Sequence, residues 1–255
     1  MIPYPNISPE IVRIGPLAVR WYGLMYLMGF AASLLLVKYQ IRRKGLKLKA
    51  DFVETLYSYL IAGLLLGARL GYVIFYNAEY YLEHPLEVFS IWQGGMSFHG
   101  GFIGVLAAGL LFCRRHRADF WMVADLITVT APIGLGLGRL GNFINGELYG
   151  RVTDVPWAMI FPGESMPRHP SQLYEFFLEG VALFTVLWTI KGRLKSGQLT
   201  ALFFVLYGIF RIIAEFFREP DPQIGYILGF ITMGQILSCL MVGAGALLFV
   251  ARGRN

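Results

Sequence analysis

The chain has 255 residues, of which 56% are hydrophobic and only 15% charged, with a mean hydropathy of +0.57. A soluble domain carries roughly 25% charged residues, so this composition argues against a soluble protein and indicates a polytopic membrane protein. The formal net charge of +6 does not indicate a nucleic-acid-binding protein, because most basic residues lie in short clusters between apolar segments. Cys113 and Cys239 lie in different apolar segments without a CxxC spacing, so we expect neither a disulfide nor a metal site.

Seven segments are long and apolar enough to cross a bilayer, which takes about 20 mostly apolar residues in a helix. We therefore predict an all-α membrane fold with about seven transmembrane helices in a single domain, residues 1–255. The predicted spans are, approximately, residues 17–38, 52–76, 97–113, 120–138, 173–190, 199–217 and 226–250.

The connections between these spans alternate in charge. Residues 38–49, 114–117, 191–195 and 251–255 are basic, whereas residues 77–95, 139–172 and 218–225 carry acids such as Glu87, Glu164 and Asp221. The positive-inside rule places the basic set in the cytoplasm and the other set outside. An odd number of spans then predicts an outer N-terminus and a cytoplasmic C-terminus, with residues 139–172 as the longest outer connection.

Lysine and arginine are distributed differently across this topology. All six lysines lie on the predicted cytoplasmic side, and the eight Lys or Arg residues elsewhere are all arginines. Arginine is costly within a membrane, but its planar fork binds phosphate in a bidentate manner that lysine cannot reproduce. We expect Arg13, Arg20 and Arg218 to extend to the membrane surface from helix ends. Arg139 and Arg211 are the candidates for a binding role.

The segment "GRLGNFINGELYGR" (residues 138–151) places polar residues at the outer end of the predicted fourth span. Arg139, Asn142 and Asn145 are spaced so that they share one face if the helix continues. Such a polar cluster is tolerated at membrane depth only where protein buries it or a wet cavity surrounds it. It is either a hydrogen-bond network between helices or, the reading we favour, a binding site for an anionic headgroup.

A second segment, "QGGMSFHGGFIG" (residues 93–104), places His99 at the outer start of the predicted third span. A lone histidine in a membrane segment is often a structural hydrogen-bonding residue. Here the surrounding glycines leave the imidazole accessible, so a chemical role is an equal alternative.

Two further segments carry charged residues at helical spacing. In "RHPSQLYEFFLEG" (residues 168–180), His169 precedes a proline, and Gln172, Glu175 and Glu179 share a face of the predicted fifth span. In "FRIIAEFFREPDP" (residues 210–222), Arg211 and Glu215 stand four residues apart. That pair is either a simple intrahelical ion pair or a carboxylate that directs the arginine towards a phosphate.

The sequence contains no GxSxG, HExxH or Walker motif. Neither cysteine is placed to act as a nucleophile at the outer face. If the protein is an enzyme, we expect its nucleophile to arrive with a substrate.

The segment at residues 138–151 resembles the signature of bacterial prolipoprotein diacylglyceryl transferases. The similarity extends to "WYGLMYLMGF" (residues 21–30), "SFHGGFIG", "RHPSQLYE" and "FRIIAEFFREPD", in the expected order and over essentially the whole chain. The resemblance implies an enzyme of the bacterial inner membrane whose active site faces the periplasm. It implies transfer of the diacylglyceryl group of phosphatidylglycerol to the lipobox cysteine thiol of prolipoproteins, with a thioether formed and glycerol phosphate released. No metal or organic cofactor is implied.

The residues fit that reaction in the following roles. Arg139 and Arg211 would stabilise the leaving phosphate, with orienting hydrogen bonds from Asn142 and Asn145. His99 could take the thiol proton. The remaining candidates line the site for substrate: Tyr26 as a headgroup or proton-relay partner, Glu147, Glu175 and Glu215 as partners of the arginines, and His169 and Gln172 beside them.

A phospholipid carrier or flippase is the alternative from a different class of function. A carrier would more naturally place polar groups at mid-depth or on both faces, and no internal repeat is evident. An intramembrane protease fits less well, because the spans contain neither a serine motif nor paired aspartates.

Overall fold

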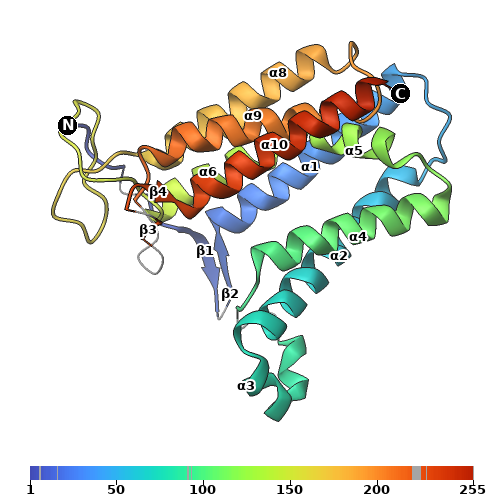
Figure 1. Ribbon diagram of the computed structural model, residues 1–255. Coiled ribbons are helices and arrows are strands. Elements are labelled where there is room, and N and C mark those ends of the chain that lie inside the picture. The colour runs from blue at the N-terminus through green and yellow to red at the C-terminus, as the bar shows by residue number, and fades with distance from the viewer. Residues whose placement is uncertain are drawn as a thin grey trace. The chain divides into compact units, whose positions relative to one another are not determined.

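The structure is a computed structural model of the chain, and it describes every residue except 6, 16, 91, 93, 220–224, 228 and 255 (Figure 1). Gln93 and Asp221, which belong to the segments discussed above, therefore lie outside the described residues. The chain divides into two compact units, Met1–Val37 with Ala124–Asn255, and Lys38–Val123. That the two form a single membrane domain stays a prediction.

The larger unit contains helices and two short hairpins, and it shares α1 and α5 with the second unit. Its elements are β1 (Glu10–Ile14), β2 (Leu17–Arg20), α1 (Trp21–Arg43), α5 (Phe120–Thr128), α6 (Ala131–Asn145), α7 (Ser171–Glu175), the π-helical segment η3 (Phe176–Ala182), α8 (Leu183–Ile190), α9 (Gln198–Glu215), β3 (Tyr226–Ile227), β4 (Ile231–Thr232) and α10 (Met233–Arg254).

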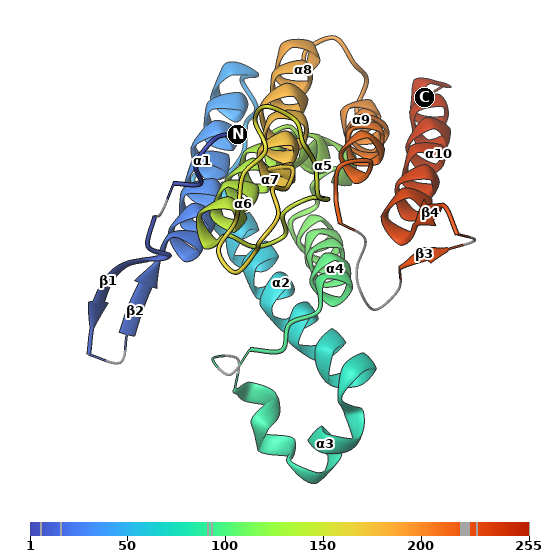
Figure 2. The ribbon, with the colours of Figure 1, turned by 90° about the vertical axis from the view of Figure 1, so that its left-hand side faces the viewer.

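Helix α9 begins at a buried carboxylate supplied by another helix. Asp125 of α5 accepts hydrogen bonds from the backbone N–H groups of Gly197 and Thr200, at 2.7 and 2.8 Å, and from the Thr200 hydroxyl at 2.7 Å. These N–H groups have no partner within the helix itself, so a negatively charged acceptor stabilises the helix start. The next helix, α10, lies alongside α9 in both views (Figures 1 and 2).

The second unit packs α2 (Phe52–Tyr76) against α4 (Phe98–His116), with α3 (Ala78–Glu83) and the 3₁₀ helix η1 (Pro85–Phe89) between them in sequence. The two long helices approach closely at glycines: a Cβ on Gly67 would lie 2.4 Å from the carbonyl oxygen of Gly100. The guanidinium of the buried Arg69 donates to four backbone carbonyls between residues 87 and 95, and so fixes the loop that leads into α4.

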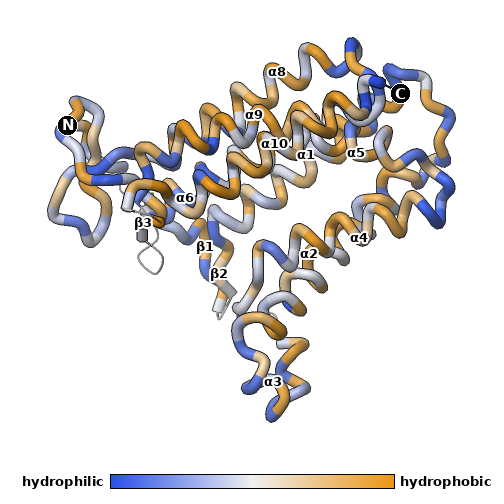
Figure 3. The backbone as a smooth tube through the Cα atoms, viewed as in Figure 1, coloured by the Kyte–Doolittle hydropathy of each residue, from blue (hydrophilic) through white to orange (hydrophobic). Residues whose placement is uncertain are grey.

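Six helical segments in the described part of the chain are long and apolar enough to cross a membrane. They match the predicted first, second, fourth, fifth, sixth and seventh spans, and Figure 3 shows apolar residues along them and many hydrophilic residues in the connections. Helix α4 occupies the predicted third span with 19 residues but is not among the six. Seven spans and the orientation of the termini stay predictions.

Three of the predicted span boundaries are wrong where they bear on the two hairpins or on the candidate site. The first helix begins at Trp21 rather than residue 17, and the last begins at Met233 rather than residue 226. In both places the predicted helix start is a short strand, and the β1–β2 turn contains Gly15 with φ of +59°. The fold is therefore mostly helical, with two short hairpins beside the helices.

The third boundary concerns the candidate site. Helix α6 continues to Asn145, where Gly146 ends it in the left-handed conformation with φ of +67°. The connection to α7 is therefore residues 146–170 rather than 139–172. Because the helix continues, Arg139, Asn142 and Asn145 lie on a helix at the spacing that the sequence suggested.

Candidate active site

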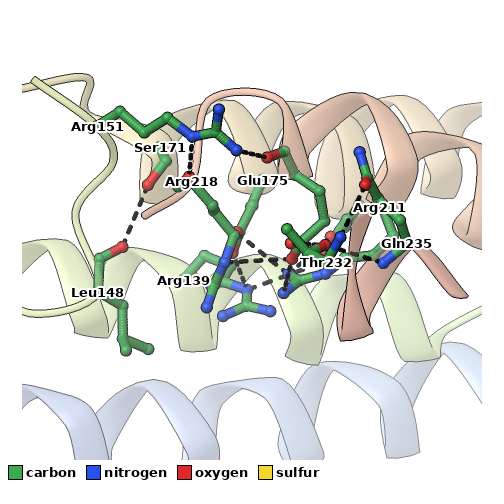
Figure 4. A network of polar contacts seen from close by, with 11 residues as sticks. Arg139, Leu148, Arg151, Ser171, Glu175, Arg211, Arg218, Thr232 and Gln235 are labelled. Carbon is green, nitrogen blue, oxygen red and sulfur yellow. Dashed lines mark hydrogen bonds and ion pairs between the residues drawn. The ribbon is translucent and has the colours of Figure 1, made fainter. Parts of the chain in front are cut away.

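Six charged side chains of the larger unit form one network of ion pairs, which we call the charge cluster (Figure 4). Helices α6, α7, η3 and α9 and the turn after α9 supply them, so residues far apart in sequence meet in one place. Three arginines and three glutamates balance in formal charge, which reduces the cost of burying them. The members are Arg139, Glu175, Glu179, Arg211, Glu215 and Arg218.

Glu175 lies at the centre of the charge cluster, with a side chain only 1% exposed. Its Oε2 lies 2.6 Å from Nε of Arg139. Its Oε1 lies 3.2 Å from Nη1 of Arg211 and 3.1 Å from Nη1 of Arg218. One carboxylate therefore forms ion pairs with three guanidinium groups, and the contact from Nη1 of Arg218 is also a hydrogen bond.

Glu179 and Glu215 complete the acidic half of the cluster. Glu179 is fully buried and lies farther from its partners, 3.6 Å from Arg139 and 3.5 Å from Arg211. Glu215 lies 2.7 Å from Nη2 of Arg211 and accepts a hydrogen bond of 2.8 Å from the Thr232 hydroxyl. Arg211 is thus held from both sides by carboxylates.

Arg139 forms ion pairs with Glu175 and Glu179. Nε is its nearest nitrogen to each carboxylate, and within the described part of the chain no hydrogen bond engages Nη1 or Nη2. Its side chain is 20% exposed, more than that of Arg211 or Arg218. The carboxylate of Glu175 therefore orients the guanidinium and leaves the terminal pair of donors for another group.

A small polar cavity of about 60 Å³ adjoins the cluster on the side of α10. Arg211, Glu215 and Arg218 contribute charged atoms to its wall, and Thr232 and Gly234 close it. A Cβ on Gly234 would lie 2.7 Å from the carboxyl carbon of Glu215, so only glycine leaves that carboxylate in place. The cavity is large enough to hold water beside the ion pairs.

A second polar group lies at the end of α6 around Glu147. The side-chain amides of Asn142 and Asn145 donate to Glu147 Oε1 at 2.8 and 3.1 Å. Gln172 donates from Nε2 to the backbone carbonyl of Glu147 at 2.7 Å. The asparagines therefore hold the start of the connection after α6 rather than the charge cluster itself.

The connection 146–170 is also fixed to the end of α9. Arg151 donates from Nε to the carbonyl of Arg218 at 2.7 Å, and Gly150 forms a β-bridge with Arg218. Farther along, Glu164 accepts hydrogen bonds from Tyr149 and from Arg168. These bonds hold the pKa of the Glu164 carboxyl below its usual range. Because Gly150 and Arg151 both bond to the backbone of Arg218, the backbone position of Arg218 depends on this connection.

Three predicted site residues remain, Tyr26, His169 and His99, and none of them belongs to the charge cluster. Tyr26 of α1 is exposed and shares a hydrogen bond of 3.1 Å with Tyr22. The His169 ring packs on Tyr174 and Phe217, and its Nδ1 lies 3.1 Å from the Tyr174 hydroxyl. Burial and, secondarily, the nearby Arg151 lower the pKa of His169.

His99 belongs to the other compact unit. It lies in the first turn of α4, which Ser97 caps by accepting from the N–H of Gly100 at 3.2 Å. Its ring is exposed and contacts Phe98 at a centroid distance of 5.6 Å. The imidazole is therefore accessible, as the glycine-rich sequence suggested.

Sequence reasoning missed two members of the charge cluster and one of its partners. The expected extension of Arg218 to the membrane surface is wrong, because its side chain is only 12% exposed and pairs with Glu175 and Glu215. Glu179 shares the predicted face with Glu175 but was not expected in the site, although that spacing was the available signal. Thr232 lies in the predicted seventh span, and no sequence pattern there indicates that its hydroxyl binds Glu215.

The chain matches the family model described as "Prolipoprotein diacylglyceryl transferase" over residues 9–251. It is 52% identical to a relative from Desulfotalea psychrophila, covering 97% of this chain and 94% of the relative. It is 51% identical to one from Bordetella avium, covering 100% and 98%. A third, from Legionella pneumophila strain Lens, is 49% identical, covering 99% and 100%. All three carry the name phosphatidylglycerol–prolipoprotein diacylglyceryl transferase.

Proposed function

Because the chain belongs to the prolipoprotein diacylglyceryl transferase family, we propose that its charge cluster holds the phosphate of phosphatidylglycerol during transfer of the diacylglyceryl group. The activity is a transfer from phosphatidylglycerol to prolipoproteins, as in the relatives of about the same length. Their names give no support to a carrier or flippase without covalent chemistry.

The reaction is an alkyl transfer. The sulfur of a prolipoprotein cysteine attacks the glycerol carbon that bears the phosphate ester, a C–S bond forms, and the C–O bond breaks. The electron pair of that bond leaves on the phosphate oxygen, and the product is glycerol phosphate. Donors that are already oriented towards this developing charge, in a site from which water is excluded, lower the barrier most.

The observation that carries the proposal is the orientation of Arg139. Its Nε lies 2.6 Å from a carboxylate oxygen of the buried Glu175, and its two terminal nitrogens form no hydrogen bond with the described residues. A guanidinium held in this way needs no reorganisation to receive two phosphate oxygens. Arg211, held by carboxylates on both sides, would add positive charge at the same place.

The thiol proton also needs an acceptor, because a cysteine with a pKa near 8.5 is mostly protonated at neutral pH. We propose His99 for this role, because an exposed imidazole at a helix start is accessible to a substrate. The proton would pass from the thiol to the imidazole as the sulfur attacks. Tyr26 and Gln172 remain proposed contacts for the lipid headgroup or its surroundings.

The setting proposed for this chemistry is the bacterial inner membrane. We propose seven spans including α4, an outer N-terminus, a cytoplasmic C-terminus and a charge cluster on the periplasmic side. The separation of lysines from the eight arginines supports this orientation.

A mass measurement tests the function directly. The purified protein is incubated with phosphatidylglycerol and a lipobox peptide, and the peptide should gain one diacylglyceryl unit. A peptide with serine in place of the cysteine is the matched control and should keep its mass. An unmodified cysteine peptide in the presence of folded protein would exclude the transferase.

A further inference from the structure

Two glycines bring α6 and η3 into backbone contact directly beside the charge cluster. A Cβ on Gly180 would lie 2.8 Å from Cα of Gly136, and a Cβ on Gly136 would lie 3.0 Å from Cα of Gly180. Both values are below the 3.4 Å at which ordinary contact begins, and the obstructing atoms are backbone. Neither helix can therefore accept a methyl group here without moving away from the other.

The contact lies within one turn of the paired charges on each helix. Arg139 follows Gly136 by three residues, about 4.5 Å along the helix axis. On the other side, Glu179 directly precedes Gly180, and the π-helical segment η3 begins directly after Glu175. π-Helical segments frequently occur at functional sites. The separation of the two backbones at this contact thus sets how far Nε of Arg139 lies from both carboxylates.

We infer that Gly136 and Gly180 are positioning residues for the transfer reaction: their contact fixes the direction of the Arg139 fork through Glu175 and Glu179. This inference rests on the proposed role of Arg139 in binding phosphate. The glycines act only through the arginine and touch no substrate.

The first part of the test compares two alanine substitutions with a control on the same helix. Gly180→Ala and Gly136→Ala separate the helices by roughly half an ångström, because Cβ contacts of 2.8 and 3.0 Å must open to 3.4 Å. A displacement of about 1 Å at a reacting group can lower turnover about a hundredfold, so we expect turnover to fall by about tenfold in each. The control is Gly138→Ala: this glycine adjoins Arg139, but a Cβ there meets nothing within 4 Å. Turnover of the control should stay within threefold of wild type.

The second part separates positioning from a general loss of stability. Each substitution is repeated in an Arg139→Lys background, in which turnover is already reduced. If the glycines act through Arg139, Gly180→Ala should then lower turnover by less than about threefold more, because coupled residues are not additive. A protein that is only destabilised would lose the same factor in both backgrounds.

The outcomes are distinct for the two proposals. Full additivity in the double variants, or a loss in Gly138→Ala as deep as in Gly180→Ala, would overturn the positioning role and leave the phosphate-binding role intact. Near-wild-type turnover of the single Arg139→Lys variant would instead overturn the phosphate-binding role, and with it the reason for the positioning role. Thermal melting of every variant confirms that the compared proteins are folded.

Discussion

The buried carboxylate of Glu175 lies 2.6 Å from Nε of Arg139 and so fixes the direction in which the guanidinium faces. The same carboxylate contacts Arg211 and Arg218 through its other oxygen. The first two predictions below follow from this pairing of one cation with a buried anion.

Arg139→Lys keeps the positive charge but loses the planar fork. Charge-assisted hydrogen bonds contribute roughly 1.5–3 kcal/mol each, and every 1.4 kcal/mol is about tenfold in rate. We expect turnover to fall by about tenfold to a hundredfold, and further in Arg139→Ala. Thioether formation on a lipobox peptide in nanodiscs measures this. A folded lysine variant within a few-fold of wild type would mean that Arg139 is only a structural partner of Glu175.

Glu175→Gln should destabilise the protein more than Glu179→Gln does. Glu175 has ion pairs of 2.6 to 3.2 Å with three arginines, whereas the ion pairs of Glu179 measure 3.5 and 3.6 Å. Removing one partner of a buried ion pair costs about 3–5 kcal/mol, so Glu175→Gln should lower the Tm by several degrees. Thermal melting in detergent compares the two variants. Equal or reversed losses would contradict the central position of Glu175.

His99→Gln should lower turnover more than it lowers affinity for phosphatidylglycerol. If the imidazole accepts the thiol proton, the variant depends on thiols that are already ionised, so raising the pH should partly restore the rate. The measurement is turnover against pH, together with lipid binding. Near-wild-type turnover at pH 7 would make His99 a structural residue or a secondary ligand.

The folded protein should lose stability on acidification through His169. Burial and Arg151 lower the pKa of this histidine in the folded state, whereas the unfolded value is about 6.5. The unfolded chain therefore binds the proton more readily, and stability falls as the pH drops below about 6.5 towards the folded pKa. The difference in Tm between pH 7.5 and pH 5.5 should shrink in His169→Gln. It should not shrink in the control His84→Gln, which changes an exposed histidine. An unchanged difference in His169→Gln would exclude this linkage.

Accessibility labelling tests the topology. Tags at residues 42–49, at residues 114–117 and at the C-terminus should report cytoplasm, because these segments carry the basic clusters. Tags at residues 146–168, in the connection after α6, should report the outside. A cytoplasmic signal anywhere in residues 145–165 would reverse the topology and move the proposed site to the other face.

The sequence by itself determined the membrane class, the approximate place of the apolar helices and four of the six members of the charge cluster. The length of an apolar segment can be read directly from the sequence. A spanning helix forms the hydrogen bonds of its own backbone within one continuous segment, so no distant residue is needed to recognise it. The spacing of Arg139, Asn142 and Asn145 also predicted their placement on one helix correctly, because that prediction required only that α6 continue to Asn145. The two hairpins were missed because their apolar residues extend the adjoining apolar segments and do not differ from them in composition.

Only the tertiary structure decided which charges meet. Glu175 pairs with Arg139, Arg211 and Arg218, which lie 36 to 43 residues away along the chain and in other elements. Whether such side chains touch depends on how closely the helices approach, and the backbone contact of Gly136 with Gly180 sets the approach of α6 to η3. The sequence suggested that Arg218 would reach the membrane surface. Its side chain instead lies within the charge cluster, paired with Glu175 and Glu215. The asparagines of the same motif instead hold the connection after α6, because Glu147 accepts from both.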